Sequence, residues 1–355
     1  MKKDTNFIYV LRFVAAIIVV INHYSTIRNT FVNNGGEAVS FFFLLSGFIL
    51  VVAYEKQIVQ NNLSATTFYV KRIARVYPLY LFALFLTLSF HFLVHYSHSH
   101  LSLKLPLELL MIQSWFYSGS INYPAWSISC EFFFYLLFPL YIIKLKDKSI
   151  RTAVYIAIML LTTIMATSYL LENQSYSFFR PDLKGGFLYQ HPLVRLPMFF
   201  WGNVLGFMYI KNVTVSTKQL IGMLVSGCFF IFLWTFKPLV IGMSLKQLGL
   251  LLIYTVLIVW LLQNESFSLK YLNNKGFVLL GDISYGVYLL QFPISSFVLI
   301  FTNDFNTAQS FAIFVTVLLV ASYLVHEYFE KPLREKIIND YGVPKTSRAY
   351  TYTEK

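Results

Sequence analysis

The sequence predicts an all-α membrane protein, a polytopic bundle of about ten transmembrane helices with both termini in the cytoplasm. Its residues are 57% hydrophobic and 12% charged, whereas a soluble domain carries about 25% charged residues. Apolar runs long enough to cross about 30 Å of hydrocarbon recur along the whole chain. These runs are continuous and do not alternate apolar with polar residues, which favours helices over the strands of a barrel.

The expected spans follow one another from end to end. The basic start and the apolar stretch after it are similar to a signal peptide, but Arg12 interrupts the stretch and no small-residue cleavage site follows, so we expect a retained first helix. Segment 105–116 is apolar but short, so we expect a re-entrant or interfacial helix there; a span would reverse every later helix. The spans are expected at about 8–26, 38–54, 78–96, 126–143, 152–171, 192–210, 220–236, 247–263, 277–301 and 308–328.

The basic residues predict the orientation. With a cytoplasmic N-terminus, the inner loops and the C-terminal tail carry 20 Lys and Arg residues against 7 outside. This asymmetry accounts for the net charge of +12, so the charge does not indicate a nucleic-acid partner. We expect a multi-pass protein of the cell (plasma) membrane in contact with membrane lipid, with one membrane domain over 1–335 and a polar cytoplasmic tail over 336–355. Cys130 and Cys228 are expected to be packing thiols.

Two ionisable residues stand in the first span, where charge is costly and therefore indicates function. Arg12 and His23 are eleven positions apart, about three helical turns, so both project from one face about 16 Å apart along the axis. An imidazole can take up a proton near neutral pH. The alternative is structural: Arg12 extends to the inner headgroups and His23 lies in the outer interface.

A second group of candidates is basic. Arg72 and Arg75 are one helical turn apart at the inner face, a spacing that allows two guanidinium groups to hold one phosphate. The alternative is a solvated inner loop that contacts lipid headgroups. Further upstream, the glycines and Ser46 of 35–48 permit close helix approach.

A third group begins the span at 126–143. Glu131 is a carboxylate about one turn into an apolar helix, where it can accept hydrogen bonds from sugar hydroxyls or pair with a buried cation. Trp126 has the alternative role of an interfacial anchor. His91 and His95 have helical metal-ligand spacing, but nothing else marks a metal site and we expect none.

Six motifs, in order over residues 7 to 335, resemble acyltransferase family 3, a membrane family that includes polysaccharide and lipopolysaccharide O-acetyltransferases. Their common order makes the resemblance specific. They are the pair Arg12 and His23, the segment Gly35–Phe48, the run Arg72-Ile73-Ala74-Arg75-Val76-Tyr77-Pro78 (which resembles an Arg-x-x-Arg-x-x-Pro loop), Trp126-Ser127 with Glu131, the segment Leu280–Leu289, and the closing Glu330-Lys331-Pro332-Leu333-Arg334.

The resemblance implies transfer of an acyl group, usually acetyl, from acyl-coenzyme A to a hydroxyl group. His23 would then be catalytic, either as the base that takes the hydroxyl proton or as a transient acyl carrier. Arg12 would assist it by positioning the donor or stabilising the oxyanion. Arg72 and Arg75 would bind the phosphates of cytosolic acetyl-CoA, a co-substrate.

The acceptor implied by the resemblance is a sugar or polysaccharide, bound at the outer side by Trp126, Ser127 and Glu131.

In one place the chain departs from the family pattern. The family commonly has a histidine before the proline of the penultimate helix, where this chain has Gln291. Glutamine keeps hydrogen bonding but cannot titrate, so the proton chemistry is assigned to His23.

Other functions remain open on the sequence. A transporter or flippase of lipid-linked sugars would use Arg12 and Glu131 to line a path. A second enzymatic alternative acylates a small hydrophobic acceptor such as a macrolide, or transfers succinyl in place of acetyl.

Overall fold

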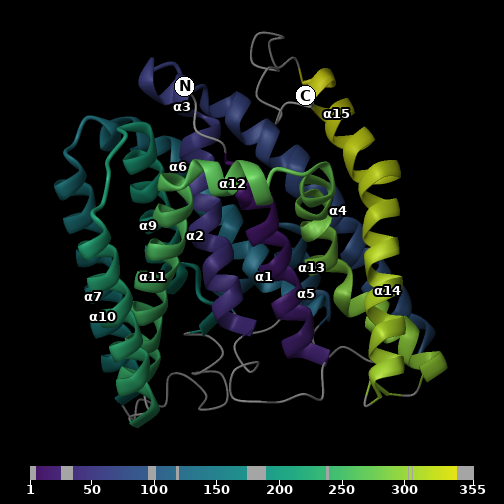
Figure 1. Cartoon of the computed structure of the whole chain (residues 1–355). Helices are drawn as coiled ribbons and strands as arrows, with labels where there is room; N and C mark the ends of the chain where they lie inside the picture. Colours follow the sequence, from purple (N-terminus) through teal and green to yellow (C-terminus); the bar gives the residue numbers. More distant parts are fainter. Residues whose placement is uncertain are drawn as a thin grey trace.

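Apolar helices make up most of the molecule. A computed structural model describes residues 5–24, 35–94, 101–116, 120–173, 189–236, 240–302, 304–305 and 307–341. Over these residues ten helices are long and apolar enough to cross a membrane and no strand occurs, which confirms the predicted fold class (Figure 1). The ten are α1 (Phe7–Tyr24), α2 (Gly35–Ala53), α4 (Ala65–Leu93), α6 (Trp126–Lys146), α7 (Ile150–Asn173), α9 (Pro192–Ile210), α10 (Thr217–Phe236), α11 (Val240–Gln263), α13 (Lys275–Thr302) and α14 (Ala308–Val325).

Shorter elements lie at the two faces of this bundle. Figure 1 shows α3, α12 and α15 at one face, where α1 also begins, and α5 in the opposite half. Asn6, just before α1, donates a hydrogen bond of 2.9 Å to Asn273, between α12 and α13, and so ties α1 to this face. The short elements are α3 (Glu55–Val59), α5 (Leu101–Leu109), α12 (Glu265–Tyr271), α15 (Lys331–Asp340), the 3-10 turns η1 (Gln113–Trp115) and η2 (Tyr123–Ala125), and the π-helical turn η3 (His326–Glu330).

The helix that carries the basic cluster begins earlier than its apolar run predicts. The expected span starts at residue 78, but α4 starts at Ala65, with Ser64 accepting a hydrogen bond from the Thr67 amide at its N-terminus. Arg72 and Arg75 are therefore on a helix and not in a loop. Pro78 lies inside α4. Proline is tolerated in a membrane helix because packed neighbours can satisfy the carbonyl group that it frees.

Segment 105–116 does not cross the bundle. Its helix α5 has nine residues, about 14 Å in length, which is less than half of the hydrocarbon thickness. Glu108 of α5 is fully buried and accepts hydrogen bonds from the Ile121 amide (2.7 Å) and the Tyr80 hydroxyl (2.8 Å). Burial raises the pKa of the Glu108 carboxyl to about 7. The segment thus holds the chain before α6 against α4.

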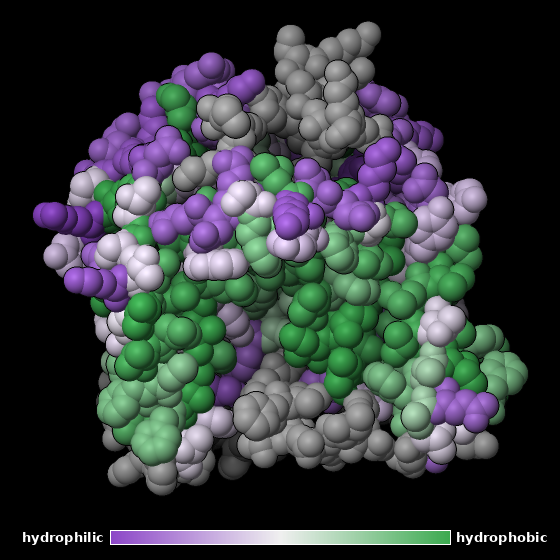
Figure 2. All heavy atoms as spheres, viewed as in Figure 1, coloured by the Kyte–Doolittle hydropathy of each residue, from purple (hydrophilic) through white to green (hydrophobic). Residues whose placement is uncertain are grey.

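Apolar side chains form a band on the face of the bundle that Figure 2 shows. Figure 2 shows hydrophobic residues in a band below a hydrophilic cap at the face where α3, α12 and α15 lie. Helix α15 extends to Asp340, so the first residues of the expected tail 336–355 are helical, and residues 342–355 lie outside the described part of the chain. Cys130 is buried, Cys228 is exposed and both are free thiols.

Helices α2 and α9 approach each other closely at two glycines. A Cβ atom at Gly47 would lie 2.0 Å from the Phe199 carbonyl oxygen, and one at Gly202 would lie 2.0 Å from the Leu44 carbonyl oxygen. Small residues let membrane helices approach to this distance, where van der Waals packing drives association. The glycines of the segment 35–48 therefore have a packing role, as the sequence predicts.

We expect Gly202→Ala to destabilise the protein by about 1–3 kcal/mol, because the added methyl group meets a backbone carbonyl that cannot move away alone. The measurement is the thermal unfolding midpoint of the detergent-purified protein. Gly222→Ala in α10 is the matched control, since nothing lies within 4 Å of its added Cβ. Equal midpoints for the two variants would contradict the packing role.

The cytoplasmic location of the capped face is a prediction of charge alone, and cysteine labelling tests it. In a background without Cys130 and Cys228, we introduce Lys218→Cys at the start of α10 and Asp304→Cys after α13, both at exposed positions. A membrane-impermeant maleimide should label Asp304→Cys in intact cells and Lys218→Cys only after permeabilisation. The reverse pattern would invert the topology.

Candidate active site

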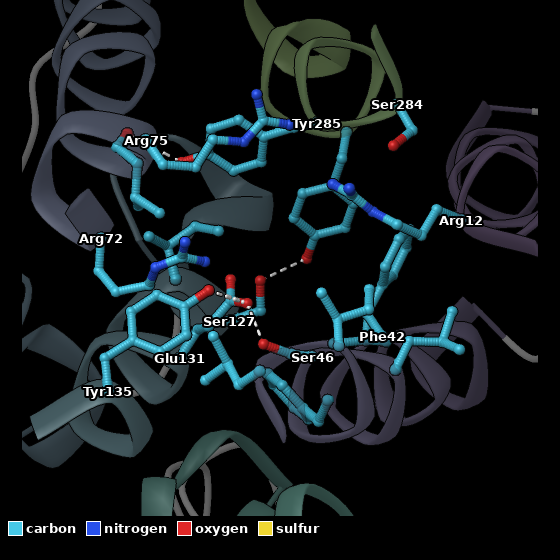
Figure 3. Close-up of a pocket in the computed structure, with 18 residues that line it drawn as sticks. Arg12, Phe42, Ser46, Arg72, Arg75, Ser127, Glu131, Tyr135, Ser284 and Tyr285 are labelled. Carbon is cyan, nitrogen blue, oxygen red and sulfur yellow. Dashed lines mark hydrogen bonds between the residues drawn. The ribbon is translucent and has the colours of Figure 1, made fainter. Parts of the chain in front are cut away.

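One cavity gathers most of the charged residues that the sequence singles out (Figure 3). Its empty space, including the part open to solvent, is about 810 Å³. Its walls come from α1, α2, α4, α6 and α13. The polar side chains in these walls are Arg12, Ser46, Arg72, Arg75, Ser127, Glu131, Tyr135, Ser284, Tyr285 and Tyr288.

Arg12 brings a positive charge into the cavity from α1. It is partly buried, and it has no hydrogen-bond or ion-pair partner among the residues that the structure describes. A guanidinium group in a low-dielectric site needs a negative partner, since burial without one is costly. The cavity therefore suits an anionic ligand next to Arg12.

Arg75 is held from behind by a carboxylate. Its Nη1 lies 2.6 Å from Oε1 of Glu330, which is fully buried, and the second Glu330 oxygen lies 3.1 Å from Nδ1 of His326. Glu330 comes from η3 near the end of the chain, so this pair joins α4 to the last helices. The pair balances part of the Arg75 charge and restrains the direction of its guanidinium group.

Arg72, one turn before Arg75, is surrounded by aromatic rings. Its guanidinium carbon lies 5.6 Å from the Tyr54 ring centroid, 5.9 Å from that of Phe68 and 6.0 Å from that of Tyr135. These cation–π contacts restrain a side chain that is otherwise flexible. The two arginines thus reach the cavity as rigid groups with different partners.

Glu131 of α6 is the only acidic residue among those that line the cavity. Ser46 donates a hydrogen bond to its Oε1 at 2.7 Å, and the Tyr135 hydroxyl donates to the same oxygen (Figure 3). Two donors hold this carboxylate as an acceptor facing the three arginines of the cavity wall. Tyr135 does not stand out in the sequence, because it lies in a run of aromatic and apolar residues, and Ser46 is noticed there only for close helix approach.

Two hydroxyl groups that bond to each other lie at one end of the cavity lining. Ser127 of α6 and Tyr288 of α13 form a hydrogen bond of 2.8 Å, and the Tyr288 hydroxyl also donates to the Pro124 carbonyl group at 2.9 Å. Both side chains are buried. This pair lies at the end of the cavity lining that is farther along α13 from its start.

His23 is not among the lining residues and lies beyond that end. Its Nδ1 is 2.9 Å from Oε1 of Gln291, on the helix turn that follows Tyr288. The Tyr123 ring meets the imidazole edge-on, with centroids 5.2 Å apart. The structure therefore brings Arg12, Arg72, Arg75, Ser127 and Glu131 to one cavity and places His23 in the next layer.

Trp126 points away from the cavity. Its side chain is 5% exposed, and its ring lies 5.8 Å from the guanidinium carbon of Arg195. Arg195 is itself buried and stacks on Tyr189 at 4.1 Å. Trp126 thus helps to pack the start of α6 against α9 and does not offer a surface to a ligand in the cavity.

Comparison with known proteins decides the family. The profile of a family described as an acyltransferase domain matches residues 5–326, nearly the whole chain. The chain belongs to the acyltransferase 3 family. No solved structure matches it.

Curated relatives agree with this assignment. The chain is 37% identical to acyltransferase MdmB of Streptomyces mycarofaciens over 128 residues, which is 33% of this chain and 31% of the relative. It is 22% identical to O-acetyltransferase OatA of Staphylococcus aureus over 97% of this chain and 59% of the relative. It thus spans about three-fifths of the OatA length. Ten spans and this family identify a multi-pass membrane acyltransferase.

The acyltransferase shows no metal-binding group of three or more His, Cys, Asp or Glu side chains over the described ranges. Of the histidines near the C-terminal end of α4, His91 is described and lies 6.0 Å from the Phe292 ring, centroid to centroid. His95, His98 and His100 lie outside the described residues.

Glu330→Gln should destabilise the acyltransferase by about 3–5 kcal/mol, because it leaves the Arg75 charge buried without its carboxylate. Lys331→Gln is the matched control: it breaks the adjacent pair with Glu327, at 3.3 Å and about one-third exposed, which should cost less than about 1 kcal/mol. Thermal unfolding in detergent compares the two. A Glu330→Gln midpoint equal to that of the control would contradict a stabilising pair.

Proposed function

We propose that this acyltransferase moves an acetyl group from cytosolic acetyl-CoA to a hydroxyl group of a cell-envelope polysaccharide or its lipid-linked precursor. The observation that carries the proposal is the arrangement of two layers. A cavity with three arginines adjoins a histidine that is held by one hydrogen bond on the far side of the Ser127–Tyr288 pair.

The arginines fit the phosphates of the donor. Coenzyme A is polyanionic, and guanidinium groups bind phosphate through paired hydrogen bonds. Arg12 supplies a charge without a described partner, whereas Arg72 and Arg75 are restrained by rings and by Glu330. Arg12 is about 16 Å from His23 along α1, too far for both to contact one reacting atom. This distance favours donor binding over oxyanion stabilisation as the role of Arg12.

The chemistry assigned to His23 is general base catalysis. The acceptor hydroxyl oxygen attacks the thioester carbonyl carbon while its proton passes to the imidazole. Collapse of the tetrahedral intermediate breaks the C–S bond, and the coenzyme A thiolate takes up that proton. Ser127 and Glu131, near this end of the cavity, are proposed to hydrogen-bond the acceptor, and Trp126 to support them by packing.

We expect His23→Gln to lower acetyl transfer by about 10²–10⁴-fold, because glutamine keeps the hydrogen bonding of the ring but cannot take up a proton. The measurement is the acetyl content of envelope polysaccharide by mass spectrometry, at matched membrane abundance. His91→Gln is the matched control, since it alters a histidine in another spanning helix, outside the cavity.

Near-normal acetyl content in His23→Gln would remove His23 from the mechanism. The same experiment on cells without the gene tests the reaction itself. Loss of a mass of one acetyl unit supports the transferase, loss of a succinyl unit would revise the acyl group, and altered glycan abundance without a mass change would favour transport.

A further inference from the structure

A proline interrupts the backbone hydrogen bonding of α13 close to His23. Pro293 has no amide hydrogen, so the Leu289 carbonyl one turn earlier receives no hydrogen bond from it. Asn122, from the segment before α6, donates its Nδ2 to this carbonyl group at 3.0 Å. The next residue of that segment is Tyr123, whose ring meets His23. The break in α13 thus anchors one wall around the imidazole.

The same stretch of α13 determines how the Gln291 amide is oriented. Gln291 is fully buried, and its Nε2 donates to the Tyr288 carbonyl group at 2.7 Å. A carbonyl oxygen only accepts, so the amide nitrogen must be the atom on that side. The amide oxygen therefore faces His23, at 2.9 Å from Nδ1.

This orientation assigns the tautomer of His23. The Gln291 oxygen has no hydrogen to give, so the hydrogen in the contact belongs to Nδ1 of the imidazole. In a neutral ring the lone pair is then on Nε2. Tyr24 and Tyr123, with rings edge-on at 6.0 and 5.2 Å, restrict the ring from two sides.

We infer that Gln291 is a positioning residue, which holds His23 with its proton on Nδ1 and makes Nε2 the nitrogen that exchanges the proton in catalysis. The inference rests on the proposed role of His23 as base. The hydrogen bond from Nδ1 to Gln291 persists when Nε2 takes up a proton, so no group has to reorient in the reaction. A neutral amide thereby orients the ring without adding a charge to the span, where a charge is costly.

A packing role and a positioning role for Gln291 make opposite predictions about which of two variants, Gln291→Leu or Gln291→Glu, is the more active. Gln291→Leu fills the space without offering an acceptor, whereas Gln291→Glu keeps an acceptor oxygen against Nδ1 and, when protonated, also a donor for the Tyr288 carbonyl group. If Gln291 orients the base, Glu retains more activity than Leu. If Gln291 only fills space, Leu is tolerated and Glu is the more harmful change.

The experiment measures kcat and the donor KM for acetyl transfer in membranes. We expect Gln291→Leu to lower kcat by about 10–100-fold, the loss that follows removal of the outer hydrogen-bond partner of a metal-bound histidine. The donor KM should stay within about two-fold of its original value. Gln291→Glu should retain a higher kcat than Gln291→Leu. Ser296→Ala, further along α13, controls for disturbance of the helix because its hydroxyl donates to the Phe292 carbonyl group at 3.0 Å.

The outcomes separate this inference from the proposed function. An inactive His23→Gln together with a fully active Gln291→Leu would overturn the positioning role and leave the base in place. A kcat for Gln291→Leu equal to or above that of Gln291→Glu would also overturn it. A fully active His23→Gln would overturn the function itself. Folding of each variant is checked by its thermal midpoint, so that a kcat loss is counted only where the midpoint is unchanged.

Discussion

The ion pair between Arg75 and Glu330 is the interaction on which the arrangement of the cavity depends. Nη1 of Arg75 and Oε1 of Glu330 are 2.6 Å apart, and the carboxylate is fully buried. The pair joins α4 to η3, the turn that follows α14. Loss of either partner would leave the other charge largely buried without compensation, so the pair holds the two elements together. The part of α4 that carries Arg72 and Arg75 is thereby held against η3.

Several polar groups of the site have hydrogen-bond donors from other helices or segments. The carbonyl group freed by Pro293 is satisfied by Asn122, and the Glu131 carboxylate by Ser46 and Tyr135. Arg12 is different, because it lines the cavity and has no partner among the described residues. An anion bound beside Arg12 would give its guanidinium group the partner that the described residues do not supply.

The two layers of the site are separated along the axis of α1. The basic cavity lies toward the face where α1 and α4 begin, and His23 lies about 16 Å further along α1. A donor with its phosphates at one face and its reactive group on a long arm suits this separation. The Ser127–Tyr288 hydrogen bond lies one turn of α13 before Gln291, the partner of His23.

Hydropathy along the chain was sufficient to predict the ten spans, because a run of apolar residues is a local property that a membrane turns into a helix. The start of α4 was placed too late, since its first turns are polar and are held by a Ser64 cap, which hydropathy does not detect. The common face of Arg12 and His23 also follows from helix geometry alone.

Only the tertiary structure decided which groups meet. Arg75 and Glu330 are 255 residues apart, and His23 and Gln291 are 268 apart, so no local pattern links them. Residues on one helix can also face opposite ways, and packing against α9 turns Trp126 out of the cavity that Ser127 and Glu131 line. The sequence by itself determined the spans and the ionisable residues within them, whereas helix packing determined which charge each of those residues meets, because partners are chosen by distance in space and not along the chain.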